Sequence, residues 1–190
     1  MTSIAVRRLT VGDYHRMAEV GIFSADERVE LLNGNLISMA AKGTAHSSAT
    51  TRTRKAIEAG LGEQVLVRVQ DPVQLDDYSE PEPDIAVVAL EPLEYVDHHP
   101  KPSEIFLLIE VADTSLAFDL GAKALAYARS GIPEYWVLDV QFRKLYVLRF
   151  PMAEGYKSEV VLTETMQIAS LAFPDYTLEI REMLPLMAAD

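Results

Sequence analysis

Residues 83–123, PDIAVVALEPLEYVDHHPKPSEIFLLIEVADTSLAFDLGAK, decide the fold, because they contain two apolar runs that each carry one carboxylate. Asp84 stands at the mouth of the run 85–90, and Glu110 closes the run 105–109. Continuous apolar runs of this kind are typical of strands that are buried on both faces. A charge in such a strand is costly unless a cation, a partner or hydrogen bonds compensate it. If the two strands are neighbours, their carboxylates converge.

Length and composition indicate one domain, residues 1–190, with a substantial core, since 49% of the 190 residues are hydrophobic. The chain has no cysteine, so any metal must be held by oxygen or imidazole. No apolar run approaches the ~20 residues of a membrane span. The first eight residues lack the apolar core of a signal peptide, and we therefore expect a cytoplasmic protein.

The formal net charge of −12 is the strongest argument in the sequence against a dedicated nucleic-acid binder. Attraction to phosphate normally comes from a basic surface. Bound divalent cations can offset part of this charge, because they are often the largest local charges in a site.

Local patterns predict a mixed α/β domain. A helix follows the capping sequence at Thr10, and Asn33-Gly34 is the dipeptide that best supports a tight hairpin turn, which puts Glu30 on a strand. The other predicted elements are helices over 45–60, 119–129 and 178–184, strands over 65–69, 73–75 and 159–162, a short strand near 168, and a hairpin formed by 135–138 and 145–148.

Asp84, Glu110 and Lys123 are the parts that phosphodiester hydrolysis requires. A magnesium ion held by Asp84 and Glu110 would polarise the phosphate and activate a water, and Lys123 would supply positive charge where negative charge develops. Each residue also has a simpler interpretation. Aspartate before a strand is a common turn residue, and a helix lysine at the edge of an apolar stripe usually reaches to solvent. Glu110 is harder to dismiss, because glutamate is seldom fully buried without a partner.

Short motifs spread over almost the whole chain share the pattern of one family. They are RVELLNG at 28–34, His46, QDPV at 70–73, PD at 83–84, EVADTS at 110–115, DLGAK at 119–123, YARSGIPEYW at 127–136 and Asp139. Together they closely resemble the Uma-two family of restriction-endonuclease-like proteins, formerly a domain of unknown function. That family belongs to the PD-(D/E)XK nuclease superfamily.

The resemblance implies a restriction-endonuclease-like fold, in which helices flank a central mixed sheet with β-hairpin additions, and metal-dependent cleavage of DNA. It implies that Asp84 and Glu110 bind the metal and that Glu30 is a further acidic member of the catalytic site. The superfamily pattern E-x-K would place a lysine two residues after Glu110, where this chain has Ala112. The resemblance therefore makes Lys123 the candidate replacement.

Gln70 and His46 are candidates for contacts with substrate or with groups around the metal. Gln70 would either hydrogen-bond a metal-bound water or pair with backbone near the sheet. A lone histidine on an inward helix face, such as His46, is more often a satisfied core residue than a ligand.

The first functional hypothesis is an endonuclease that uses Mg²⁺ or Mn²⁺ to hydrolyse DNA. The acidic composition favours two alternatives: a catalytically silent binding or regulatory module with the same fold, and a hydrolase of a small phosphorylated substrate. We also expect a homodimer, because hairpin edges need covering and two-fold dimers are the commonest assembly.

Overall fold

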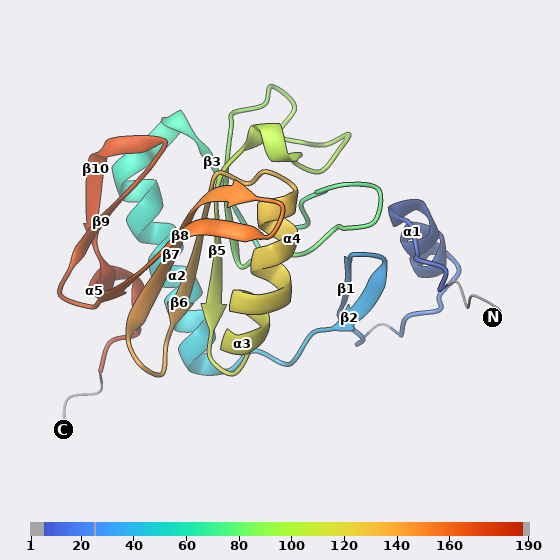
Figure 1. Cartoon of the computed structure of the whole chain (residues 1–190), viewed down its shortest axis with the longest axis horizontal. Coiled ribbons are helices and arrows are strands. Elements are labelled where there is room, and N and C mark those ends of the chain that lie inside the picture. Colours follow the sequence, from blue (N-terminus) through green and yellow to red (C-terminus); the bar gives the residue numbers. More distant parts are fainter. Residues whose placement is uncertain (1–5, 25, 188–190) are drawn as a thin grey trace.

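Six strands form a mixed central sheet in the middle of the molecule (Figure 1). The computed structural model describes residues 6–24 and 26–187. In spatial order the strands are β3 (Leu66–Val69), β4 (Ile85–Val88), β5 (Ile105–Ala112), β6 (Glu134–Asp139), β7 (Lys144–Met152) and β8 (Gly155–Thr163). Strands β5 and β6 are parallel, and the other neighbours are antiparallel. The expected fold class, a mixed sheet flanked by helices, is confirmed.

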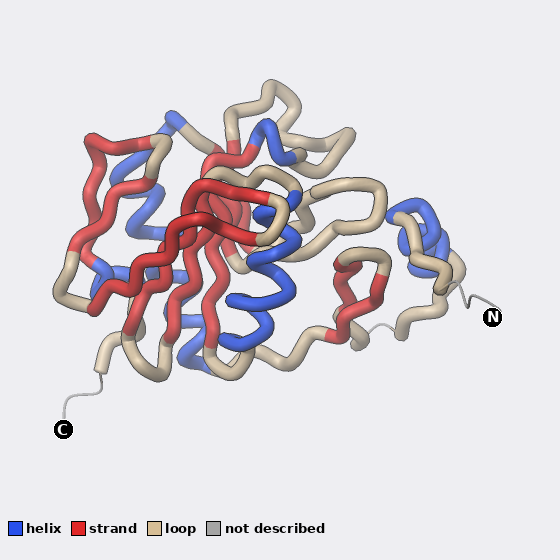
Figure 2. Tube along the Cα trace, viewed as in Figure 1, coloured by secondary structure: helices blue, strands red, loops and turns tan. Residues whose placement is uncertain are grey.

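Helical segments cover both faces of the sheet (Figures 1 and 2). On one face lie α2 (Thr44–Leu61), α5 (Ile180–Met183) and the hairpin of β9 (Gln167–Ser170) and β10 (Phe173–Glu179). On the other face lies a segment made of α3 (Leu116–Phe118), the π-helical turn Asp119–Lys123 and α4 (Ala124–Arg129).

Side-chain alternation along the strands divides the core between these two faces. In β5, Leu107, Ile109 and Val111 pack toward α2, whereas Leu108 and Ala112 pack toward α4. Glu110 has the same parity as the second set, so its side chain points to the α4 side. The register of β4 and β5 pairs Ile85 with Ile109, so Asp84 and Glu110 come next to each other at the end of this pair.

Helix α1 (Val11–Glu19) and the hairpin of β1 (Val29–Leu32) and β2 (Asn35–Ser38) lie to one side of the sheet (Figure 1). The turn of the hairpin has positive φ angles at Asn33 (52°) and Gly34 (76°), as predicted from this dipeptide. Backbone hydrogen bonds between Leu31 and Glu80 tie β1 to the loop that leads to Asp84. The hairpin is therefore held where Glu30 faces the sheet.

Most predicted elements are confirmed, with three corrections. Residues 73–75 are not a strand, because their amides bond to loop carbonyls, as in Gln74 to Pro100. The helix expected over 119–129 begins earlier and contains a π-helical turn. The helix expected over 178–184 is shorter, because β10 extends to Glu179. Residues 1–5, 25 and 188–190 lie outside the described part of the chain, and with them both ends of the expected 1–190 domain.

Candidate active site

A cavity of about 590 Å³ opens where the β1–β2 hairpin, the start of α2, the ends of β4 and β5, and the π-helical turn meet. Its lining includes four carboxylates from four different segments that are only 1–5% exposed: Glu30, Asp84, Glu110 and Asp119. Lys123, which is 4% exposed, also lines it. The cavity thus concentrates negative charge in a place where water cannot screen it fully.

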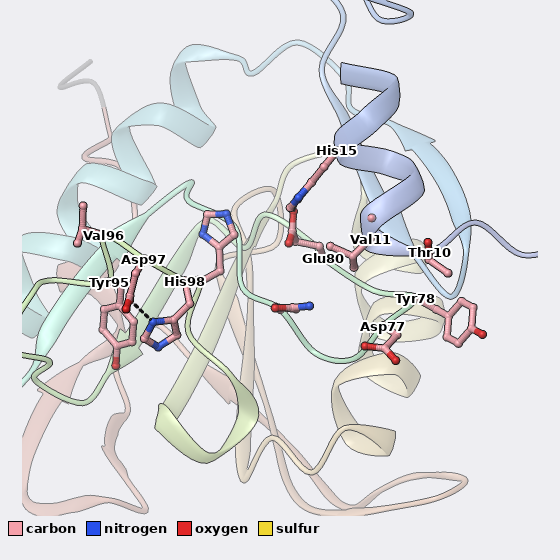
Figure 3. A pocket seen from close by; sticks show the side chains of 13 residues that line it. Thr10, Val11, His15, Asp77, Tyr78, Glu80, Tyr95, Val96, Asp97 and His98 are labelled. Carbon is pink, nitrogen blue, oxygen red and sulfur yellow. Dashed lines mark hydrogen bonds and ion pairs between the residues drawn. The ribbon is translucent and has the colours of Figure 1, made fainter. Parts of the chain in front are cut away.

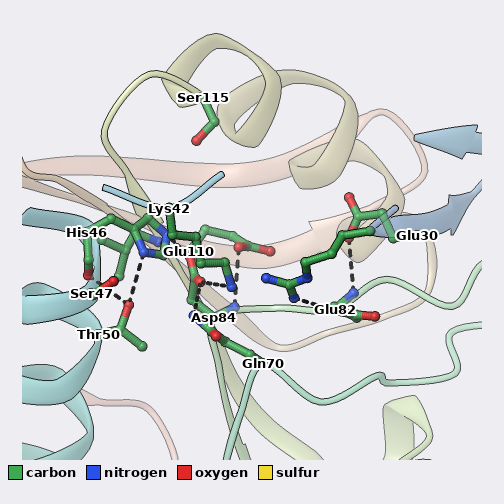
Figure 4. A network of polar contacts seen from close by, with 12 residues as sticks. Glu30, Lys42, His46, Ser47, Thr50, Gln70, Glu82, Asp84, Glu110 and Ser115 are labelled. Carbon is green, nitrogen blue, oxygen red and sulfur yellow. Dashed lines mark hydrogen bonds and ion pairs between the residues drawn. The ribbon is translucent and has the colours of Figure 1, made fainter. Parts of the chain in front are cut away.

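Asp84 is held from both sides of its carboxylate (Figure 4). Its Oδ2 accepts the backbone N–H of Val111 (2.9 Å) and lies 3.0 Å from Nε2 of His46. Its Oδ1 accepts Nε2 of Gln70 (3.2 Å) and lies 3.5 Å from Nζ of Lys42. Because these groups come from β5, α2 and two loops, the fold fixes the orientation of this carboxylate.

Glu110 and Lys123 form the centre of a buried ionic cluster. Nζ of Lys123 donates to Oε1 of Glu110 (2.9 Å) and lies 3.2 Å from Oε2 of Glu30. The hydroxyl of Tyr127 also donates to Oε1 of Glu110 (2.8 Å), while the backbone N–H of Asp84 donates to Oε2 (3.4 Å). Lys123 therefore bridges the hairpin and the sheet through two carboxylates.

The environment shifts the pKa values of Glu110 and Asp84 in opposite directions. Burial raises the pKa of Glu110 to about 8; Lys123 opposes this shift and Asp84 reinforces it. Burial would also raise the pKa of Asp84. The hydrogen bond and charge of His46, the N–H of Val111 and the charge of Lys42 together outweigh burial, so the pKa of Asp84 is lowered. Burial would lower the pKa of Lys123, but Glu110 and Glu30 outweigh it and the pKa is raised. The cluster keeps Asp84 ionised and Lys123 charged.

The π-helical turn explains why Lys123 points inward. It inserts a wider turn between α3 and α4, and the side chains of Asp119 and Lys123 are both buried. On an ideal helical wheel Lys123 falls only at the edge of the apolar stripe beside Tyr127. Such turns occur mostly as single interruptions of a helix and are frequent at functional sites. Because of this turn, Lys123 lines the cavity and does not lie at the margin of the apolar helix face.

The donor set fits a hard divalent cation. Carboxylate oxygens are the ligands of Mg²⁺, which usually keeps several waters and needs only one or two protein carboxylates besides substrate phosphate. Asp84 and Glu110 provide such a pair, and the buried excess of carboxylates favours added positive charge. Within residues 6–24 and 26–187, no group of three or more His, Asp or Glu side chains is arranged to enclose a metal. A cation held by Asp84 and Glu110 would therefore have to take its other ligands from water and substrate.

A second cavity of about 560 Å³ lies between α1 and the loops around residues 74–80 and 95–99 (Figure 3). In its lining, Nε2 of His15 lies 2.6 Å from Oε1 of Glu80. His98 lies in the same lining but is engaged by its neighbour Asp97. This cavity is lined by other residues than those predicted for catalysis, and it does not bring a lysine beside paired carboxylates.

The structure brings together all six residues singled out from the sequence: Glu30, His46, Gln70, Asp84, Glu110 and Lys123. Sequence reasoning missed Lys42, Tyr127 as a partner of Glu110, and Asp119. Tyr127 stood on the inward stripe of its helix, which was a usable signal. Lys42 lies in an irregular segment between β2 and α2, where no periodic pattern indicates direction.

A mixed sheet with paired carboxylates and a lysine at the ends of β4 and β5 places this molecule among the nuclease-like folds. The model of the Uma2 family, described as "Putative restriction endonuclease", matches residues 11–181, and the chain belongs to this family. A solved structure from Anabaena variabilis, titled a putative nuclease of DUF820, superposes with a TM-score of 0.69 at 14% identity. The match covers 92% of this chain and 97% of that one, and it shows a shared fold. No curated protein matches the chain.

Proposed function

We propose that this protein is an endonuclease that hydrolyses phosphodiester bonds of DNA with the help of Mg²⁺ or Mn²⁺. The observation that carries the proposal is that Asp84, Glu110 and Lys123 line one cavity. Glu110 joins the other two, because it accepts the backbone N–H of Asp84 (3.4 Å) and Nζ of Lys123 (2.9 Å). Family membership supports the nuclease class, and the geometry supports this cavity as its centre.

Asp84 and Glu110 are the residues that would hold the cation. When bound, it would supply Lewis acidity at the phosphate and lower the pKa of a water. The backbone N–H of Val111 and the ring of His46 hold Oδ2 of Asp84, and Gln70 holds Oδ1, so these contacts orient the carboxylate. Such supporting contacts tune a site through the orientation of its ligands.

Lys123 would place a positive charge beside the reacting phosphate, where it stabilises charge that develops during hydrolysis. Glu30 is the second carboxylate of this lysine and would act as a further acidic member of the catalytic site. Glu30 also accepts the backbone N–H of Glu82, which couples the hairpin to the loop that precedes Asp84.

The net charge of −12 requires that binding to DNA be weak and depend on the cation. The same charge favours the second candidate, a catalytically silent module that keeps the fold and the cavity. A hydrolase of a small phosphorylated substrate is the third, since a cavity of about 590 Å³ suffices for it.

We also propose that the chain acts as one domain and as a cytoplasmic homodimer. Strands β3 and β8 are the edges of the central sheet, and Phe142 in the β6–β7 turn is 69% exposed. A two-fold dimer would cover such edges and would match the symmetry of duplex cleavage. None of the described helices is long and apolar enough to cross a membrane. Light scattering after gel filtration tests the dimer; the mass of a monomer would contradict it.

A plasmid-nicking assay tests the proposed activity. The wild type should nick supercoiled DNA with Mn²⁺ or Mg²⁺ and not with EDTA. Asp84→Asn should lose the activity by about 100-fold or more, because the variant loses the charge of a metal-binding carboxylate. Asp175→Asn is the matched control, since Asp175 is exposed in β10 and the charge change is the same. Full activity of Asp84→Asn, or no nicking by the wild type with either metal, would contradict the proposal.

A further inference from the structure

Lys42 is a cavity residue that makes one long ion pair, with Asp84. Its side chain is 17% exposed, and Nζ is buried without a hydrogen-bond partner among residues 6–24 and 26–187. The nearest carboxylate oxygen is Oδ1 of Asp84, at 3.5 Å. An ammonium carries three N–H donors, so one long ion pair leaves it able to bind a further anion.

The contrast with Lys123 shows which lysine is available to a ligand. Lys123 donates to Glu110 at 2.9 Å and lies 3.2 Å from Glu30, so two carboxylates already surround its ammonium. Any anion that approaches Lys123 must compete with both. In the described part of the chain, Asp84 is the one carboxylate that forms an ion pair with Lys42, and the same oxygen of Asp84 is also bound by Gln70.

Lys42 also stands at the beginning of α2, an 18-residue helix that starts at the cavity. The residue before the helix is Gly43, which has no side chain to cap the first amide groups. Helix N-termini attract anions, so this end of α2 adds to the attraction of Lys42. In Figure 4, Lys42 lies beside Asp84 and Glu110, whereas Glu30 lies farther away on the hairpin.

We propose that Lys42 binds a non-bridging oxygen of the substrate phosphate and holds it beside the Asp84 and Glu110 pair. The inference rests on the proposed nuclease function, which it deepens by assigning the phosphate contact. The two lysines then have different contacts: Lys42 binds the phosphate as it arrives, and Lys123, held by Glu110 and Glu30, faces the charge that develops during hydrolysis.

The test compares the wild type with Lys42→Met, Lys42→Arg and Lys55→Met. Methionine removes the charge of Lys42 and keeps the length of the side chain. Lys55 is exposed on α2 outside the cavity, so Lys55→Met changes the net charge equally. The readouts are Mn²⁺ binding, affinity for a labelled DNA duplex in Ca²⁺ at several salt concentrations, and the stabilisation of the protein by inorganic phosphate with Mg²⁺ at fixed ionic strength.

We expect Lys42→Met to bind Mn²⁺ as well as the wild type or better, because a competing charge near Asp84 is gone. Its affinity for DNA should fall about tenfold or more, and the slope of log K against log salt should fall by about 0.9, the value for one lost phosphate contact. Phosphate should no longer raise its melting temperature. Lys42→Arg should recover part of the DNA affinity and part of the stabilisation by phosphate. Lys55→Met should match the wild type in every readout.

The outcomes separate this inference from the proposed function. Equal DNA affinity, salt slope and phosphate stabilisation in Lys42→Met and the wild type would overturn the role of Lys42, even if the wild type nicks DNA. A wild type that does not nick DNA, yet is stabilised by phosphate through Lys42, would support the phosphate contact and refute the nuclease. A wild type that binds neither DNA nor phosphate would overturn both.

Discussion

Lys123→Met should destabilise the metal-free protein, because it leaves Glu30 and Glu110 buried without their shared cation. Removing one partner of a buried ion pair costs about 3–5 kcal/mol. Methionine conserves most of the side-chain volume, so little of the loss would come from packing. For a chain of this size the free energy of unfolding would fall enough to lower the melting temperature by roughly 6–20 °C.

The pH dependence of this loss identifies its cause. The pKa of Glu110 is raised to about 8, so the contribution of this group to the free energy of unfolding falls as pH rises from its ordinary pKa of 4.5 to 8 and then levels off. Without Lys123 that pKa would be higher still, and the variant would continue to lose stability above pH 8. The difference should therefore grow by up to ~1.4 kcal/mol per pH unit above pH 8.

Urea unfolding in EDTA at pH 6, 8 and 9 measures the difference, with Lys55→Met as the control for net charge. A loss under about 1 kcal/mol at pH 8, equal to that of Lys55→Met, would show that Lys123 does not compensate the two carboxylates. A loss that is the same at pH 8 and 9 would show that Glu110 is not the group affected.

Three further changes test the supports of the site by urea or thermal unfolding. Glu110→Gln removes a carboxyl of raised pKa, so metal-free wild type should lose stability relative to this variant between about pH 5 and 8; a constant difference would contradict the shift. Tyr127→Phe removes a buried hydroxyl that donates to Glu110 and should lower the free energy of unfolding by about 1–2 kcal/mol. An unchanged free energy of unfolding would show that this hydrogen bond does not stabilise the fold. Gly34→Ala should cost more than about 1 kcal/mol, because φ is +76° and the added Cβ would lie 2.6 Å from Cβ of Arg8. Gly12→Ala, where the nearest atom is 3.9 Å away, is its control and should be nearly neutral.

The sequence predicts well where local chemistry decides the structure. The Asn33-Gly34 turn follows from the positive φ angles that these residues tolerate. The apolar runs of β4 and β5 follow from burial on both faces, and their carboxylates are adjacent because the strands pair. These local rules, together with the family resemblance, were enough to place Asp84 and Glu110 together.

The orientation of the lysines depends on long-range packing, which no local pattern encodes. A regular helical wheel leaves Lys123 at the edge of its stripe, so its removal would be expected to affect folding little. The π-helical turn buries it instead between the sheet and the hairpin. Lys42 carries no sequence signal, because the segment before α2 is irregular.

A buried glutamate is not by itself evidence of a catalytic site, as Glu134 shows. It is fully buried at the start of β6, and its carboxylate accepts hydrogen bonds from Trp136, Arg149, Ser170 and the backbone N–H of Leu171. These partners satisfy it and attach the β9–β10 hairpin to the sheet. What distinguishes Glu110 is the cavity that it lines beside Asp84.

Calorimetric titration with Mn²⁺ tests most directly the claim that Asp84 and Glu110 form a metal site. The wild type should bind with a dissociation constant in the micromolar to millimolar range, on the order expected for an open oxygen-ligand site. The double variant Asp84→Ala with Glu110→Ala should show no binding at the same concentrations, while Asp175→Asn should bind as the wild type does. Unchanged Mn²⁺ binding by a folded double variant would contradict the account and place the metal elsewhere.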